Sequence, residues 1–147
     1  MYTITLPTDF GLVIGAGGFM GLALLVTSNL AATKRKSAGV EYPNLYASDV
    51  TAKADPKAYL FNCAQRGALN PHETYATSLF GLATGGLVFP RLAAGAGLAW
   101  GVGAVLLYAG YVRGAELRYS RGGLILRVAS FALQILPFVA AYNFLTR

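Results

Sequence analysis

Residues 62–90 read NCAQRGALNPHETYATSLFGLATGGLVFP, and this stretch decides the fold. Its first half holds an arginine, a histidine and a glutamate, whereas residues 74–90 carry no charge. A helix that crosses a membrane needs about 20 mostly apolar residues. The stretch therefore predicts a membrane span with a polar start, and the apolar pattern extends upstream to about Ala58.

Three further uncharged runs occupy residues 10–33, 92–112 and 128–146. The chain has 147 residues, of which 55% are hydrophobic and only 12% are charged. Ordinary soluble domains carry about a quarter charged residues. We therefore predict an all-α polytopic membrane protein, a bundle of four transmembrane helices that forms one domain over residues 1–147.

The basic residues predict how the spans are oriented. Eight of them lie in or near the first and third loops, and only two lie on the opposite side. The eight are Lys34, Arg35, Lys36, Lys53, Lys57, Arg113, Arg118 and Arg121, and the two are Arg91 and Arg147. The positive-inside rule then places loops one and three in the cytosol and both termini on the other side. Because this net charge of +6 sits in short loops between apolar runs, we expect no nucleic-acid partner.

Glycine spacing predicts close helix packing. Four pairs have the small-xxx-small spacing that lets backbones approach in lipid: Gly17/Gly21, Gly81/Gly85, Gly97/Gly101 and Gly110/Gly114. Chance pairing among 18 glycines is the alternative explanation. Pro71 and Pro137 fall inside spans and are candidate kinks.

The polar start of the second span contains a stripe of functional groups. Asn62, Arg66, Asn70 and Glu73 are spaced 4, 4 and 3 residues apart, which puts them on one face of a helix. A single helix from Ala58 to Phe89 would be about 48 Å long, against a hydrocarbon core of about 30 Å. We therefore expect Arg66 at the cytosolic headgroup boundary, with Asn70 and Glu73 just inside it.

Other helices bring polar groups to the same depth. Arg35 and Lys36 end the first helix, and Tyr111 and Arg118, seven residues apart on one face, end the third. Cations can hold carboxylates, a glutamate can hold an ammonium group and an asparagine can bond a peptide. The set would suit an anionic or zwitterionic peptide-like ligand.

Simpler interpretations remain open for several of these residues. Arg66 and Glu73 can pair only with each other, and the arginines near the third loop can act only as topology anchors. Cys63 is expected as a small buried hydrophobic residue, and His72 as a structural or interface residue. With one cysteine and one histidine, the sequence predicts no metal site.

Four motifs resemble the microsomal glutathione transferase 3 branch of the MAPEG family of membrane proteins. They are VEYPNLY at 40–46, FNCAQRGALNPHETY at 61–75, LVFPRLAAGAGLAW at 87–100 and YAGYVRGAELRYSRGGL at 108–124. The resemblance covers roughly residues 30–125. It implies a homotrimer of four-helix subunits in the endoplasmic reticulum or, alternatively, the outer mitochondrial membrane.

The resemblance also implies a reaction and a set of site residues. Glutathione is the implied co-substrate, bound near the cytosolic side between subunits, and lipophilic electrophiles or lipid hydroperoxides are the implied substrates. Arg66, Asn70, Glu73 and Tyr111 correspond to glutathione contacts, and Arg35 and Lys36 to a basic pair from a neighbouring subunit. Arg118 corresponds to the catalytic arginine proposed to stabilise the thiolate.

Three positions depart from the family pattern. Ala104 stands where relatives carry an arginine, Leu107 where they carry a tyrosine, and Ala68 where they carry a polar residue. These departures favour the alternative of a non-catalytic member that binds lipid or serves as an accessory subunit of a larger membrane complex.

Overall fold

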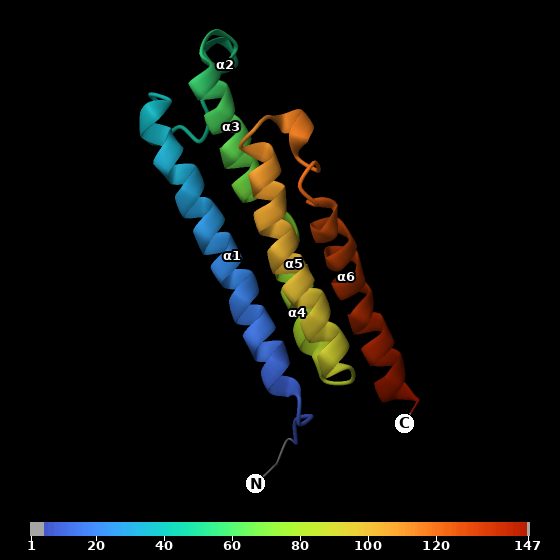
Figure 1. Ribbon diagram of the computed structural model, residues 1–147. Helices are drawn as coiled ribbons and strands as arrows, with labels where there is room; N and C mark the ends of the chain where they lie inside the picture. Colours follow the sequence, from blue (N-terminus) through green and yellow to red (C-terminus); the bar gives the residue numbers. More distant parts are fainter. Residues whose placement is uncertain (1–4, 147) are drawn as a thin grey trace.

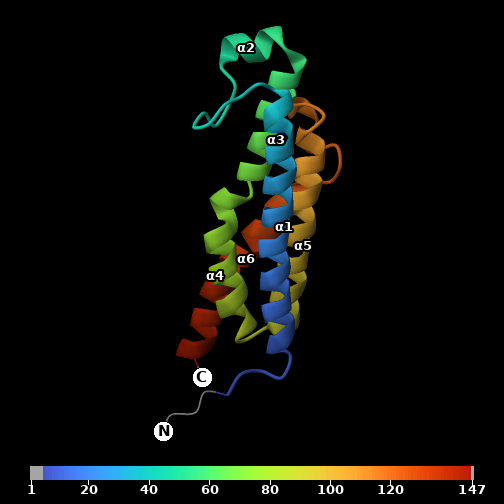
Figure 2. The ribbon, with the colours of Figure 1, turned by 90° about the vertical axis from the view of Figure 1, so that its left-hand side faces the viewer.

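The computed structural model describes residues 5–146, which form helices and turns with no strand among them. The long helices α1 (Phe10–Ser37), α5 (Pro90–Tyr111) and α6 (Leu124–Leu145) run side by side (Figures 1 and 2). A fourth rod consists of α3 (Pro56–Leu69) followed by α4 (His72–Gly86). The prediction of an all-α fold is confirmed for this part of the chain.

Three helices of the described residues are long and apolar enough to cross a membrane, and they are α1, α5 and α6. They correspond to the spans predicted at 10–33, 92–112 and 128–146. The second predicted span differs, because the single helix expected from Ala58 to Phe89 is wrong. Helical hydrogen bonding is interrupted at Asn70 and Pro71.

Pro71 explains the interruption, since proline has no backbone N–H and its ring clashes with the carbonyl four residues earlier. Pro137 behaves differently, because it lies inside α6 without ending that helix. The helix α5 begins at Pro90, where the missing N–H has no intrahelical partner to lose.

The core joins all four rods, and its fully buried side chains include Met20, Leu82, Trp100 and Leu133. Glycines let the backbones approach: a Cβ at Gly81 would overlap the Leu133 carbonyl oxygen, so α4 and α6 touch there. Two more of the predicted pairs also face side chains of neighbouring helices, and these are Gly17/Gly21 and Gly97/Gly101. The fourth pair is wrong, because Gly114 lies outside α5 at a φ of 140°.

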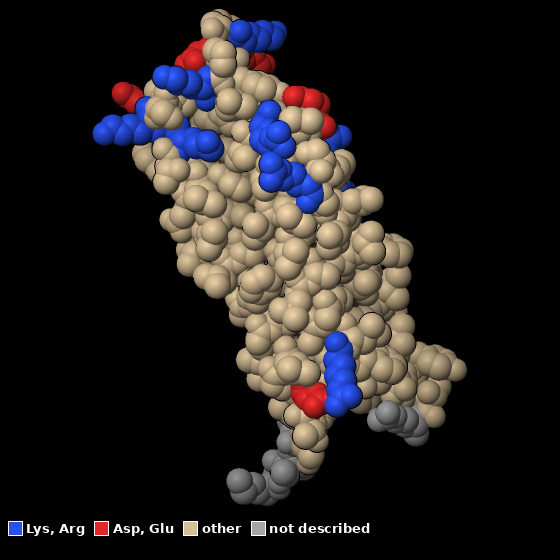
Figure 3. Space-filling model, viewed as in Figure 1, with Lys and Arg blue, Asp and Glu red and all other residues tan. Residues whose placement is uncertain are grey.

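Charge is concentrated at one end of the molecule. Figure 3 shows most Lys and Arg side chains at the end where α1 and α5 finish, and an uncharged band below them. We call this the charged end. At the opposite end, Arg91 pairs with Asp9 at 2.6 Å. This asymmetry is the distribution of basic residues from which the orientation was predicted; Arg147, counted there, lies outside the described residues.

The first loop and the short helices cover the charged end. The loop after α1 leads into α2 (Asp49–Ala54), which starts at a Ser48 side chain that accepts the Thr51 N–H. After α5, the 3₁₀ helix η1 (Ala115–Leu117) leads toward α6. In Figure 1, α2 lies above the beginning of α3, whereas η1 lies to the side of α3, next to the end of α5.

Candidate functional site

A cavity of about 450 Å³ opens at the charged end between α3, the first loop and the end of α5. Its lining residues are Tyr46, Ala47, Asp49, Asn62, Cys63, Arg66, Tyr111 and Ala115. We call it the Arg66 pocket. Two of the predicted site residues, Arg66 and Tyr111, therefore line one cavity.

Tyr111 packs against Gly67, the residue after Arg66. It is the last residue of α5, and its ring lies against Gly67, where a Cβ would come within 2.7 Å of the Tyr111 Cβ. Gly67 thus allows the end of α5 to sit directly on α3. Gly67 directly follows Arg66 in α3, so the Tyr111 side chain that packs on Gly67 forms a wall of the Arg66 pocket.

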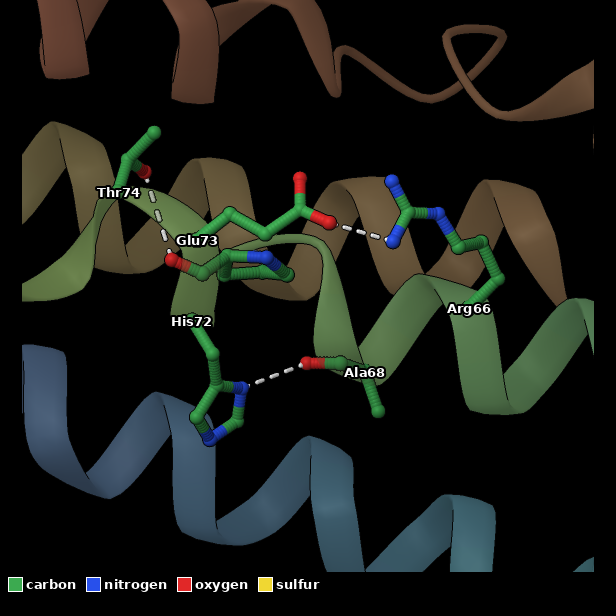
Figure 4. Close-up of polar contacts among 6 residues, drawn as sticks. Arg66, Ala68, His72, Glu73 and Thr74 are labelled. Atoms are coloured by element: carbon green, nitrogen blue, oxygen red, sulfur yellow. Dashed lines mark hydrogen bonds and ion pairs between the residues drawn. The ribbon is translucent and has the colours of Figure 1, made fainter. Parts of the chain in front are cut away.

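Glu73 pairs with Arg66 across the interruption between α3 and α4. The Arg66 Nη1 donates to the Glu73 Oε1 at 2.5 Å across the Asn70–Pro71 turn (Figure 4). The two side chains remain 44% and 54% exposed, so their charges are available to a ligand.

The predicted one-face stripe of four residues is only partly correct. Asn62 turns to the first loop, where its side chain accepts the Ala47 N–H at 2.8 Å and donates to the Ala47 carbonyl at 3.0 Å. Asn70 lies at the turn, where its carbonyl accepts the Glu73 N–H at 3.3 Å. Asn62 therefore holds the first loop in place. Asn70, which lies between Arg66 and Glu73 in the chain, has a half-buried side chain.

Arg35 and Lys36 lie at a different cavity within this chain. The Arg35 Nη1 donates to the Asn44 carbonyl at 2.5 Å, and its guanidinium stacks 4.4 Å from the Tyr42 ring centroid. With Lys36 and Tyr42 it lines a cavity of about 440 Å³ beside α1. One chain therefore does not bring this basic pair to the Arg66 pocket.

Arg118 is not placed as expected. Helix α5 ends at Tyr111, so the prediction that both residues share one helix face is wrong. Gly114 breaks the helix, and Arg118 follows η1 with its Nη1 donating to the Ala115 carbonyl at 3.0 Å. The guanidinium lies 5.0 Å from the Tyr119 ring centroid, outside the residues that line the Arg66 pocket.

Tyr59 holds the segment that precedes Arg118. Its hydroxyl accepts the Ala115 N–H at 3.4 Å and donates to the Glu116 Oε2 at 3.3 Å. This connection between α3 and η1 was not predicted. The same is true of Tyr46, which lines the Arg66 pocket although only its position in the VEYPNLY motif marked it in the sequence.

His72 and Cys63 have structural surroundings. The His72 side chain points away from the Arg66–Glu73 pair, toward α1, and its Nδ1 lies 3.0 Å from the Ala68 carbonyl (Figure 4). That carbonyl accepts the Nδ1–H, and it lies beside the turn that interrupts the helix. Cys63 is a free, buried cysteine at the edge of the pocket. The described residues contain no group of three potential metal ligands.

The three departures from the family pattern lie in the interior. Ala104 is 0% exposed, Leu107 is 2% exposed and Ala68 is 3% exposed. Ala104 and Leu107 belong to the core shared with α6. In this chain, these positions pack helices together and add no polar group to the Arg66 pocket.

Comparison with known protein families gives a match over most of the chain. The sequence model of the MAPEG family matches residues 13–142. The match contains all four rods almost completely, together with the first loop and the segment that holds Arg118.

Proposed function

Because the chain belongs to the MAPEG family, we propose that it is a membrane enzyme similar to microsomal glutathione transferase 3. It would transfer glutathione to lipophilic electrophiles and reduce lipid hydroperoxides. The observation that carries this proposal is the exposed Arg66–Glu73 ion pair beside Tyr111, at the charged end of a bundle of apolar helices. Such a site is open to water and lies next to lipid.

The ion pair suits a zwitterionic ligand. The amino-acid end of glutathione carries one carboxylate and one ammonium group, so Arg66 would bind the carboxylate and Glu73 the ammonium. The exchange costs little, since an exposed ion pair contributes only about 0–1 kcal/mol. Asn70 would bond a peptide group, and Tyr111 would close the wall of the pocket. We assign Arg35 and Lys36 of a neighbouring subunit to the same glutathione in a homotrimer.

Arg118 would supply the charge for catalysis. A free thiol has a pKa near 8.5 and is mostly protonated at neutral pH, whereas a nearby guanidinium favours the thiolate. The thiolate sulfur forms a C–S bond, and the electron pair of the broken bond leaves with the leaving group or ring oxygen, which takes a proton from water. With a hydroperoxide, two glutathiones give one disulfide, one alcohol and one water.

For Arg118 to act, its side chain must leave the Ala115 carbonyl and Tyr119. The hydrogen bond to Ala115 is local and exposed, so the guanidinium can turn without disturbing the core. Tyr59 keeps Ala115 at the rim of the Arg66 pocket, which limits how far Arg118 must move. The assembly of subunits would complete the site.

The position in the membrane follows from the lengths of the helices. At about 1.5 Å per residue, the 15 residues of α4 span about 22 Å, short of a hydrocarbon core of about 30 Å. We propose that α4 and the last turns of α3 make the second of four crossings. One domain over residues 1–147 would then lie in the endoplasmic reticulum membrane, with the outer mitochondrial membrane as the alternative.

A second candidate function is a non-catalytic lipid-binding or accessory subunit of a larger membrane complex. The buried Ala104 and Leu107 favour it, because they remove two polar groups that relatives carry. An accessory subunit would co-purify with other chains and would not bind glutathione.

The test is an ultraviolet difference spectrum of the detergent-purified protein on addition of glutathione at neutral pH. We expect a saturable thiolate band, which Arg118→Leu abolishes together with turnover while the assembly stays intact. Arg113→Leu is the matched control, since it removes an exposed arginine from the same connection. Absence of the band in the unmodified protein would favour the accessory subunit, and normal turnover of Arg118→Leu would remove the role given to Arg118.

A further inference from the structure

A second cavity lies outside the site described above, between α5 and α6. It has a volume of about 520 Å³ and is an open groove on the surface of the bundle. Its apolar wall includes Gly95, Ala96 and Ala99 of α5 and Leu124, Ile125 and Val128 of α6. The one charged residue among those that line it is Arg91, which is paired with Asp9 at the end opposite the charged end. A groove of this kind between two candidate membrane spans has the shape and polarity of an acyl-chain site.

Arginines gather where the groove reaches the charged end. Arg127 lies in the first turns of α6, three residues after Leu124 and one before Val128, and it is exposed. Arg121 is exposed in the turn that leads into α6. The headgroup end of the groove is therefore basic, whereas its interior is apolar.

These arginines have no acidic partner among the described residues, where the ion pairs are Arg66–Glu73 and Arg91–Asp9. Residues 117–146 contain no Asp or Glu at all. The nearest acid in sequence, Glu116, accepts a hydrogen bond from Tyr59 on α3. The positive charge at the groove is thus not neutralised by the protein itself.

The pKa of Tyr119 is shifted by the positive charges near the start of α6. Although partial burial alone would raise its pKa, the nearby guanidinium groups of Arg118 and Arg127 lower the pKa of Tyr119 below its ordinary value. Arg118 and Arg127 therefore both act on Tyr119, and the Arg118 guanidinium lies 5.0 Å from the centroid of its ring. The positive end of the α6 dipole, whose first turn has no acidic residue, adds to this field.

We propose that the groove between α5 and α6 binds one anionic glycerophospholipid, with its phosphate on Arg121 and Arg127 and an acyl chain along Leu124, Val128 and Ala96. Neither half of the site suffices alone, since the arginines select the negative headgroup and the groove selects the hydrocarbon chain. The inference does not depend on glutathione chemistry, because neither Arg121 nor Arg127 belongs to the Arg66 pocket.

The headgroup is tested by native mass spectrometry of the full chain in detergent, titrated with phosphatidylglycerol or phosphatidylcholine of equal chain length. An arginine near an anionic lipid surface contributes about 1 kcal/mol, which is about fivefold in affinity. We expect Arg121→Gln with Arg127→Gln to weaken phosphatidylglycerol binding about 25-fold and to weaken phosphatidylcholine binding less, because the choline group offsets the charge of the same phosphate. Lys53→Gln with Lys57→Gln is the control, since it removes the same charge from α2 and α3 at the same end.

The groove is tested by Gly95→Leu. A Cβ at Gly95 meets nothing within 4 Å, so a leucine fills the groove without displacing the backbone. We expect it to weaken both lipids severalfold. Gly15→Leu on α1, where a Cβ also meets nothing within 4 Å, is the control and should leave lipid binding unchanged.

Three results would overturn the proposal. Equal affinities for the two lipids in the unmodified protein would remove the headgroup site. An equal loss in the Lys53 and Lys57 control would reduce the effect to general surface potential. Displacement of phosphatidylglycerol by glycerol 3-phosphate at equal concentration would indicate a site for soluble phosphates in place of a lipid site.

Discussion

At the residue scale, the candidate site depends on one proline. Arg66 and Glu73 are seven residues apart, so a continuous helix would separate their Cα atoms by about 10 Å along its axis. At Pro71 the helical hydrogen bonding is interrupted, while Asn70 and Pro71 keep right-handed helical dihedrals, and the two side chains meet at 2.5 Å across this interruption. Pro71 itself is fully buried, so the turn is held in place by packing.

Glu73→Gln tests whether the ion pair binds a ligand or only joins two helices. A charge-assisted hydrogen bond contributes about 1.5–3 kcal/mol, so loss of the bond to an ammonium group should weaken glutathione binding about 10- to 100-fold. The free energy of unfolding should change by less than about 1 kcal/mol, because the pair is exposed. Titration calorimetry and thermal unfolding measure the two quantities.

The purely structural interpretation predicts the opposite pattern for the same variant. Glutathione affinity would stay the same, and only the stability would fall. Asp55→Asn is a suitable control, because Asp55 lies outside both the Arg66 pocket and the cavity of Arg35 and Lys36, and asparagine can still cap α3.

At the element scale, glycine decides how closely the helices pack. Gly81 of α4 faces the Leu133 carbonyl of α6, Gly103 of α5 faces the Leu126 backbone, and Gly110 faces the Arg118 carbonyl. Side chains at these positions would separate the backbones. In a membrane, van der Waals packing is the main force between helices, so these contacts carry much of the stability of the bundle.

Gly81→Ala should therefore destabilise the protein. The added methyl group would overlap a backbone oxygen, and overpacking of this kind typically costs about 1–3 kcal/mol. Gly15→Ala is the control, since a Cβ there meets nothing within 4 Å and alanine is the better helix former. Thermal unfolding followed by circular dichroism ranks the two variants. An unchanged melting temperature for Gly81→Ala would contradict the close α4–α6 contact.

At the scale of the whole molecule, the separation of charge defines two ends. The connections at the charged end carry nearly all the basic residues, and the other end holds the Arg91–Asp9 pair (Figure 3). Moving either end across a bilayer would carry charged groups through hydrocarbon, at a cost of about 2.5–3.5 kcal/mol for each arginine or lysine at the centre. This distribution of charge is the basis of the predicted orientation.

Cysteine labelling measures that orientation. In a Cys63→Ala background, the Ser120→Cys variant should react with a membrane-impermeant maleimide in sealed vesicles whose cytosolic face is outward. The Thr146→Cys variant should react only after detergent is added, because α6 ends at the opposite face. Labelling of both variants in sealed vesicles would contradict the predicted topology.

The all-α class of fold, the three long apolar helices and the end at which charge is concentrated can all be predicted from the sequence. These features follow from the lengths of the uncharged runs and from the positions of the basic residues, which can be read directly along the chain. The sequence also identified Arg66 and Tyr111, which the structure places in one pocket. At Pro71 two local signals disagree. The proline predicts a kink, whereas the apolar pattern around it predicts a continuous helix.

Which polar groups contact one another depends on tertiary packing. Asn62 shares a helix face with Arg66, yet its side chain bonds Ala47 of the first loop. Arg118 follows Tyr111 by seven residues, yet Gly114 ends the helical path between them. Tyr59 reaches Glu116 across 57 residues of sequence. Such contacts depend on how separate elements pack, and helical spacing along one segment carries no information about that packing.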